Sequence, residues 1–174
     1  MKLPAPKYII LALITPLIVF LDQLTKIMVI DRFRLGETIP IVLGYFNFTY
    51  IRNTGAAFGI LSQADPSFRI PFFVIIPVVA LLVIGYIFKR IEDRDFKLSC
   101  SLSLVIGGAV GNLIDRLRLG YVIDFLDFHW SYQYHFPAFN IADSAICVGV
   151  AVLVLDLVFQ DDHPRESHHA SSVV

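Results

Sequence analysis

The stretch IPFFVIIPVVALLVIGYIF, residues 70–88, contains no acidic or basic side chain and is long enough to cross a lipid bilayer as a helix. About 20 residues of α-helix span the hydrocarbon core of a membrane. Three further apolar segments also reach spanning length, about Tyr8 to Ile30, Leu98 to Ile114 and Ile141 to Phe159. The segment from Leu98 is the shortest, so we expect its polar C-terminal turn to lie in the interface. The sequence therefore predicts four membrane-spanning helices.

Composition favours the same class of protein. Of the 174 residues, 56% are hydrophobic and 17% are charged, whereas soluble domains carry about 25% charged residues. The length fits one compact membrane domain, residues 1–160, followed by a polar tail, residues 161–174, that we expect to be disordered. A net charge of −1 provides no basic footprint for nucleic acid.

The first apolar segment resembles a signal peptide, because Lys2 and Lys7 precede it. No small-x-small cleavage site follows, so we interpret it as an uncleaved helix. Four spans place both termini on one side of the membrane. The 14 Lys and Arg residues divide equally between the two sides, but four of them crowd into the short loop from Lys89 to Lys97. The positive-inside rule weights such loops and favours cytoplasmic termini.

The segment from Arg32 to Arg69 is too polar to span the membrane. Within it, the alternation in residues 45–50 predicts a strand with Phe46, Phe48 and Tyr50 on one face. The residues Asn53-Thr54-Gly55 then favour a turn. We expect a small sheet on the membrane surface, with its aromatic face toward lipid or substrate. The alternative is an ordinary extramembrane loop.

Two aspartates, Asp124 and Asp143, flank the start of the last predicted span. Ionisable groups at membrane depth are costly and mark functional sites. Two carboxylates that meet can share a proton, as in aspartic proteases. Asn140 is a good N-cap, which makes Asp143 the third helical residue and suits it to a capping role. Capping and catalysis are compatible, since a helix N-terminus also stabilises an ionised carboxylate.

Asp22 and Lys26 lie at i and i+4 of the first span, within reach of each other. We favour a structural ion pair over direct catalysis, because charges buried in membranes are usually paired.

The third span contains small residues and a polar end. Gly107 and Gly111 form a small-xxx-small pattern that allows close approach of another helix. Asn112, Asp115 and Arg116 lie on one side of its last turn. Arg116 can either hold a carboxylate by a two-point hydrogen bond or extend toward the interface.

A metal site is a weaker alternative, built from Asp124, Asp127, His129 and His135. No HExxH or comparable helical spacing supports it. A histidine in an interfacial aromatic stretch more often anchors the protein in the headgroup layer.

Two further pairs carry weak signals. Ser144 with Lys26 could form a nucleophile pair, although nothing in the sequence links them. Cys100 and Cys147 both lie in apolar runs, so we expect small buried hydrophobic side chains and neither a disulfide nor a metal pair.

Five sequence blocks occur in the order of a known family. They are Asp22-Gln23-Leu24-Thr25-Lys26, Asn53-Thr54-Gly55-Ala56-Ala57-Phe58, residues 107–116 (GGAVGNLIDR), Val122-Ile123-Asp124-Phe125 and residues 136–144 (FPAFNIADS). In these blocks the chain resembles bacterial lipoprotein signal peptidase, also called signal peptidase II, up to about Phe159.

The resemblance implies an all-α integral membrane protein with four transmembrane helices and a small extramembrane β-rich cradle between the first two, in the segment 32–69. It implies an intramembrane aspartyl endopeptidase that removes signal peptides from diacylglyceryl-modified prolipoproteins, cutting before the lipidated cysteine. Asp124 and Asp143 match the catalytic pair. Substrate-binding or supporting roles are implied for Asp22, Lys26, Asn53, Gly55, Asn112, Arg116, Asn140 and Ala142.

The resemblance also implies a location. The protein is expected in the bacterial cytoplasmic (inner) membrane, with both termini cytoplasmic and the active site near the outer, periplasmic face. We expect a monomer that contacts membrane lipid, with no metal or other cofactor and no nucleic-acid partner.

For the chemistry, we expect ionised Asp143 to activate water while protonated Asp124 binds the scissile carbonyl. The rival from another class is a small transporter or channel subunit whose aspartates relay protons, although inverted repeats and broken helices are not visible. A non-catalytic scaffold packed through Gly107 and Gly111 is the third alternative.

Overall fold

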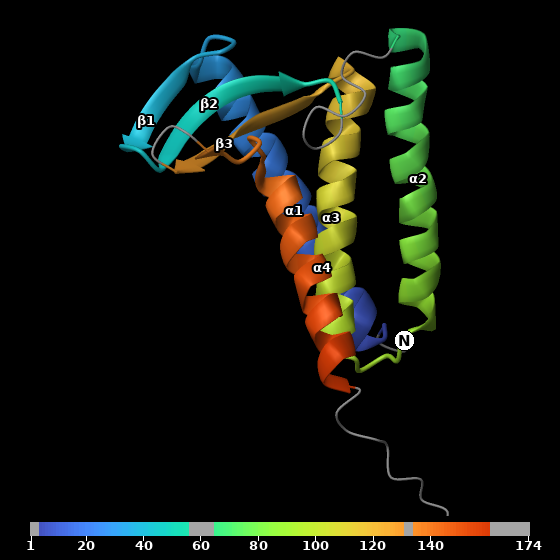
Figure 1. The fold of residues 1–174 in the computed structure, drawn as a ribbon. Helices are drawn as coiled ribbons and strands as arrows, with labels where there is room; N and C mark the ends of the chain where they lie inside the picture. Colours follow the sequence, from blue (N-terminus) through green and yellow to red (C-terminus); the bar gives the residue numbers. More distant parts are fainter. Residues whose placement is uncertain (1–3, 56–64, 131–133, 161–174) are drawn as a thin grey trace, which may run out of the picture.

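The computed structural model describes residues 4–55, 65–130 and 134–160, and shows four long helices with a small antiparallel sheet at one end (Figure 1). The helices are α1 (Pro6–Arg32), α2 (Pro66–Arg90), α3 (Phe96–Leu119) and α4 (Ile141–Gln160). All four are long and apolar enough to cross a membrane. The predicted fold class is therefore confirmed. α3 continues to Leu119, beyond the predicted span end at Ile114, because Gly120 in the left-handed conformation ends the helix.

α3 is the central helix and packs against the other three. Glycines make this packing close. A Cβ atom on Gly111 would lie 2.7 Å from Asp22 Oδ2, and one on Gly108 would meet the backbone carbonyl of Ala142. The small residues of α3 thus let α1 and α4 approach its polar end.

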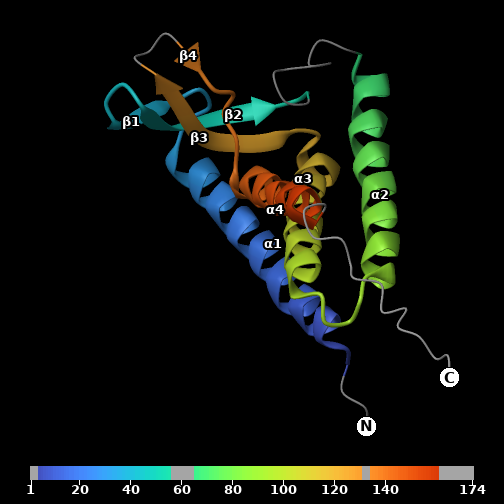
Figure 2. The ribbon, with the colours of Figure 1, turned by 60° about the horizontal axis from the view of Figure 1, so that its bottom comes forward.

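α2 packs against α3 and stands apart from α1 and α4 in both ribbon views (Figures 1 and 2). Its C-terminal end is tied to the start of α1 by Lys7. The Lys7 ammonium donates to the carbonyls of Lys89 (3.2 Å) and Ile91 (2.8 Å), and lies 3.0 Å from an Asp93 carboxylate oxygen. Lysine near a helix C-terminus satisfies carbonyls that have no partner within the helix.

The sheet has the strand order β1-β2-β3-β4, with β1 (Thr38–Val42), β2 (Phe46–Asn53), β3 (Val122–Trp130) and β4 (Tyr134–His135). β1 and β2 come from between α1 and α2, as the sequence indicated. β3 and β4 come from between α3 and α4, where no strand was predicted. The antiparallel register places Ile51 opposite Asp124 and Asn53 opposite Val122. Pairing of β2 with β3 therefore brings the two halves of the chain together.

The aromatic face of β2 differs from the expectation. Tyr50 is only 3% exposed and packs in the core beneath the sheet, and Phe46 and Phe48 are half-buried. The expected orientation toward lipid or substrate is thus wrong for Tyr50. The register shift between Phe48 and Ile51 breaks the simple alternation of faces. The core under the sheet consists of Val29, Tyr50, Ile123 and Phe125.

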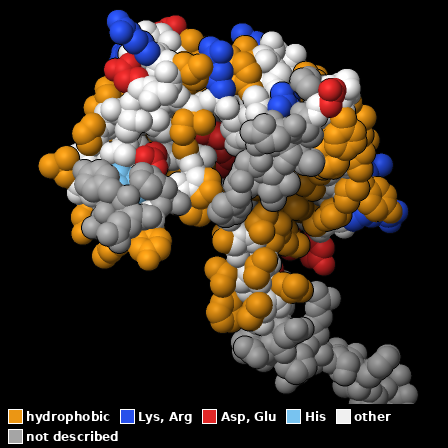
Figure 3. Space-filling view, turned by 45° about the horizontal axis from the view of Figure 1, so that its top comes forward, with side chains coloured by type: hydrophobic (Ala, Val, Ile, Leu, Met, Phe, Trp, Pro, Cys, Tyr) orange, Lys and Arg blue, Asp and Glu red, His pale blue; other side chains and the backbone are white. Residues whose placement is uncertain are grey.

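Exposed hydrophobic side chains cover the outer surfaces of the helices. Figure 3, which turns the sheet end toward the viewer, shows hydrophobic atoms over the helical part and Lys and Arg atoms around the sheet end. Further charged residues, among them Lys7, Asp93 and Arg94, lie at the other end of the helices. An apolar belt between two charged ends is the distribution expected of a membrane protein.

Candidate active site

Asp124 lies near the start of β3, and its side chain is 2% exposed. Both of its carboxylate oxygens accept hydrogen bonds from asparagine amides. Asn140 Nδ2 lies 2.8 Å from Oδ1, and Asn53 Nδ2 lies 2.9 Å from Oδ2. Burial, and secondly the negative charge of Asp143, raise the pKa of Asp124 to about 7. Asp124 therefore keeps a proton to far higher pH than an ordinary aspartate.

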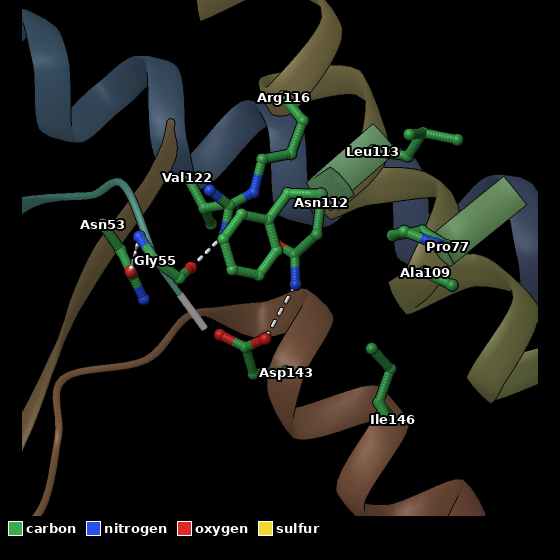
Figure 4. A pocket seen from close by; sticks show the side chains of 11 residues that line it. Asn53, Gly55, Pro77, Ala109, Asn112, Leu113, Arg116, Val122, Asp143 and Ile146 are labelled. Carbon is green, nitrogen blue, oxygen red and sulfur yellow. Dashed lines mark hydrogen bonds between the residues drawn. The ribbon is translucent and has the colours of Figure 1, made fainter. Parts of the chain in front are cut away.

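Asp143 is the third residue of α4, as predicted, and Asn140 is the N-cap. Asn140 Oδ1 accepts from the Asp143 amide at 2.9 Å, and Asp143 Oδ2 accepts from the Asn140 amide at 3.2 Å. This reciprocal pair is a capping box. The second oxygen, Oδ1, accepts from Asn112 Nδ2 at 2.7 Å (Figure 4). Asp143 thus caps the helix and joins the polar site with the same carboxylate.

Asn140 links the two aspartates directly. It is fully buried, and its amide nitrogen contacts Asp124 while its amide oxygen accepts from the Asp143 backbone. The same nitrogen also lies 3.1 Å from Asn112 Oδ1. Side chains from β3, α4 and α3 therefore meet at one point, although they are distant in sequence.

Lys26 is the centre of a second buried group next to the aspartates. Its ammonium lies 2.9 Å from each of three oxygens, on Asp22, Asp115 and Asn112. These acceptors occupy its three donor hydrogens. Asp22, Lys26 and Asp115 are 0%, 1% and 2% exposed. The ion pair of Asp22 with Lys26 is present, and Asp115 is an additional partner.

Asp115 was not predicted as a site residue. The sequence pattern places it only on the helix turn that also carries Asn112. The helical i, i+3 spacing of these two residues was a usable signal, since Asn112 was already a candidate. The contact with Lys26 joins two helices far apart in sequence, and nothing in the local pattern indicates it.

Arg116 takes neither of the two orientations considered for it. Its guanidinium donates a hydrogen bond to the Gly55 carbonyl and lies 4.6 Å from the centre of the Phe73 ring on α2. The Gly55 amide in turn donates to Asn53 Oδ1 at 3.0 Å. Figure 4 shows Arg116, Asn53 and Asp143 around one cavity. Arg116 thus joins α2 and the end of β2 to the site.

Two cavities meet at Asp143. One of about 260 Å³ lies between α2, α3 and α4, and the other of about 430 Å³ lies between α4 and the connection from β4. Both are lined by Asn53, Asp143 and Ile146, and most of their remaining lining is apolar. The space-filling view shows acidic atoms recessed in a hollow between the sheet and the helices (Figure 3). Asp143 therefore lines both cavities, whereas Asp124 lines only the larger of the two.

The candidate metal site of the sequence is described only in part. His129 is buried on β3, with Nδ1 3.4 Å from Asn47 Nδ2 and 3.9 Å from Asp127 Oδ2. The His135 side chain lies outside the described residues. Among the residues that the structure describes, no group of three or more His, Cys, Asp or Glu side chains could hold a metal ion.

The Ser144 hydroxyl donates to the Asn140 carbonyl at 2.9 Å, whereas Lys26 is held by Asp22, Asp115 and Asn112, so the structure does not form a Ser144–Lys26 pair. Both cysteines are free, as predicted. The expectation that both are buried is wrong: Cys100 is half-buried, and Cys147 is exposed and lines the larger of the two cavities.

The fold and this geometry together define a class of protein. It is a multi-pass membrane protein with carboxylates and asparagines buried at one end of its helical bundle. The chain belongs to the signal peptidase II family, because the family model described as signal peptidase (SPase) II matches residues 14–159. It is therefore a membrane peptidase.

Curated relatives agree with this family. The chain is 51% identical over 146 residues to a lipoprotein signal peptidase of Syntrophotalea carbinolica, covering 84% of this chain and 89% of that protein. It is 50% identical over 162 residues to a lipoprotein signal peptidase of Geobacter metallireducens, covering 93% and 97%. A solved structure described as a bacterial membrane enzyme matches with a TM-score of 0.80 and 33% identity, covering 92% of this chain and 94% of that chain.

Proposed function

We propose that the protein is an aspartyl endopeptidase that removes the signal peptide from diacylglyceryl-modified prolipoproteins, cutting before the lipidated cysteine. The observation that carries this proposal is the buried pairing of Asp124 and Asp143 through Asn140. Relatives named lipoprotein signal peptidase support the substrate class. The two apolar cavities beside Asp143 fit the lipid and apolar parts of such a substrate.

In the proposed mechanism, no covalent intermediate forms. The ionised carboxylate of Asp143 takes a proton from a water molecule as the water oxygen attacks the scissile carbonyl carbon. Protonated Asp124 donates a hydrogen bond to the carbonyl oxygen as it becomes negative. When the intermediate collapses, the C–N bond breaks and the leaving nitrogen takes a proton from the pair. The raised pKa of Asp124 supports its role as the protonated member.

The supporting residues hold the pair and shape the site. Asn53, Asn112 and Asn140 donate to the two carboxylates. Arg116 and Gly55 form part of the cavity wall on the α2 side. The other predicted supporting residues are Asp22, Lys26 and Ala142. Asp22 forms an ion pair with Lys26 and accepts a hydrogen bond from the Ala142 amide, next to Asp143.

We further propose that residues 1–160 act as one catalytic membrane domain and that the protein works as a monomer in the bacterial inner membrane, in contact with lipid. Both termini would then be cytoplasmic and the aspartates near the outer face. The four basic residues between Lys89 and Lys97, at the end of α2, in the short α2–α3 loop and at the start of α3, support this orientation, because they lie at the opposite end of the bundle from the sheet (Figure 1).

The test of this function uses the purified protein and two precursors that differ only in the diacylglyceryl group. Mass spectrometry of the products is expected to show cleavage of the modified precursor alone, with the lipidated cysteine as the new N-terminal residue. EDTA is expected to leave the rate unchanged. Equal cleavage of both precursors would contradict the proposed substrate, and a loss in EDTA restored by zinc would favour a metal mechanism involving His129 and His135.

A further inference from the structure

The two carboxylates that neutralise Lys26 each make a second contact. Asp22 Oδ1 accepts from the backbone amide of Ala142 at 3.0 Å. Asp115 Oδ2 accepts from the backbone amide of Ile123 at 3.2 Å. Ala142 and Ile123 are the residues immediately before Asp143 and Asp124. Each of the two carboxylates that contact Lys26 therefore accepts a hydrogen bond from the backbone amide next to one member of the proposed catalytic pair.

These contacts reach two separate elements. The Ala142 amide lies in the first turn of α4, where backbone amides have no partner within the helix. The Ile123 amide lies at the start of β3. One ammonium, 2.9 Å from both carboxylates, thus couples the placement of α4 to the placement of β3.

Gln23 joins the same two carboxylates a second time. Its side-chain amide lies 2.9 Å from Asp115 Oδ1 and 3.2 Å from Asp22 Oδ2. It also lies 3.2 Å from the Gly111 carbonyl on α3. Gln23 is uncharged and half-buried. Its hydrogen bonds therefore orient the Asp22 and Asp115 carboxylates without changing the charge around Lys26.

We propose that Asp115 and Gln23 are positioning residues of the peptidase, which fix the relative placement of Asp124 and Asp143 through the Ile123 and Ala142 amides. The inference rests on the proposed function of that pair. A purely structural ion cluster would stabilise the bundle without any need to contact these two amides. Misplacement of a reacting group by about 1 Å can lower a rate roughly 100-fold, so the expected effect is on the chemical step.

The test compares Asp115→Asn and Gln23→Leu with the wild-type protein in the lipid-modified precursor assay. Both variants are expected to lower kcat by about 10- to 100-fold with little change in KM, because the substrate surface is intact. Ser103→Ala is the matched control, since it removes another buried polar group of α3 whose hydrogen bond stays within the helix. It is expected to retain the wild-type kcat.

The pH profile of kcat distinguishes a positioning role of Asp115 and Gln23 from a role in stability alone. The alkaline limb reports the proton on Asp124, which is influenced by Asp143 on α4, Lys26 on α1 and Arg116 on α3. Gln23→Leu changes no charge, so a shift of this limb in that variant reports a change in geometry. Thermal unfolding of each variant is measured in parallel, and Gln23→Leu decides the test if Asp115→Asn does not fold.

The outcomes are distinguishable. If wild-type protein cleaves and Asp124→Asn does not, the proposed function stands. In that case, a wild-type kcat and an unshifted pH profile in folded Gln23→Leu and Asp115→Asn would overturn the positioning role alone. If wild-type protein fails to cleave, the proposed function and this inference both fail.

Discussion

Asp124 and Asp143 are the same residue type in different surroundings. Asp124 accepts from two asparagine side chains. Asp143 accepts from one asparagine side chain and from a backbone amide at the N-terminus of α4. A helix N-terminus favours negative charge. This asymmetry between the two residues supports the proposal that Asp143 carries the charge and Asp124 the proton.

The pH dependence follows from the proton on Asp124. Because the pKa of Asp124 is raised to about 7, kcat is expected to fall as pH rises above about 7, where Asp124 loses its proton. The folded protein also binds more protons than the unfolded chain between pH of about 4 and 7. Its free energy of unfolding is therefore expected to fall as pH rises through this window.

The measurement is the pH profile of kcat together with unfolding temperatures of wild-type protein and Asp124→Asn. The variant has no titrating group at this position, so its unfolding should depend less on pH. A wild-type kcat that stays level to pH of about 9 would contradict the assignment.

Arg116 and Arg118 provide a matched pair of basic residues. Arg116 donates to Gly55 and lies against Phe73, whereas Arg118 is exposed. Arg116→Ala is expected to lower kcat/KM about tenfold or more, because hydrogen bonds from charged groups contribute about 1.5–3 kcal/mol. Arg118→Ala should stay close to wild type. Equal losses in the two purified variants would make Arg116 an ordinary interfacial charge.

At the scale of elements, α3 is the platform to which the other helices attach. Its glycines bring Asp22 of α1 and Ala142 of α4 close to its axis, and its last turns carry Asn112, Asp115 and Arg116. The geometry of the site therefore depends on the absence of side chains at a few positions of this helix.

Gly111 tests this dependence. In Gly111→Ala the new methyl group would lie 2.7 Å from Asp22 Oδ2 and 3.3 Å from the Ala142 Cβ atom. Overpacking of this kind costs about 1–3 kcal/mol, so we expect a lower unfolding temperature and reduced cleavage. Gly85→Ala on α2 is the control, since a Cβ atom there meets nothing within 4 Å. If both variants unfold and cleave like wild type, close packing at Gly111 is unimportant.

The elements that were predicted correctly are those that short stretches of sequence determine. The helices follow from apolar length, and the N-cap at Asn140 follows from its residue type next to an apolar run. The strand β3 was missed because residues 125–130 (FLDFHW) also suit the headgroup layer. A strand with both faces partly covered lacks the clean alternation that marks a half-buried strand.

The candidate site was only partly predictable, for a related reason. Asp124 and Asp143 were found because charge in an apolar chain is conspicuous. The contacts of Asp115 with Lys26 and of Arg116 with Gly55 depend on packing between distant segments. Spacing along one helix cannot reveal such contacts.

At the scale of the whole molecule, the sheet and the loop between α2 and α3 lie at opposite ends of the bundle (Figures 1 and 2). Asp65 precedes α2 near the sheet end, and Arg94 lies in the loop. If the end of the bundle that carries the basic residues between Lys89 and Lys97 is cytoplasmic, the sheet and the aspartates face the outer side.

Cysteine labelling tests this orientation. Asp65→Cys and Arg94→Cys are each introduced into a protein in which Cys100 and Cys147 are replaced. A membrane-impermeant thiol reagent added to intact cells is expected to label position 65 and spare position 94. Labelling after lysis is the control for reactivity at both positions. The reverse pattern would place the aspartates on the cytoplasmic side.

The cleavage rate of Asp124→Asn and Asp143→Asn on the lipid-modified precursor tests directly whether these two aspartates form the catalytic pair. Each amide keeps the shape of the carboxyl group but can neither act as base nor share its proton. Both variants are expected to fold, insert and bind precursor, and to release no signal peptide above background. Near-wild-type release by either folded variant would show that the aspartate replaced in it does not belong to the catalytic pair.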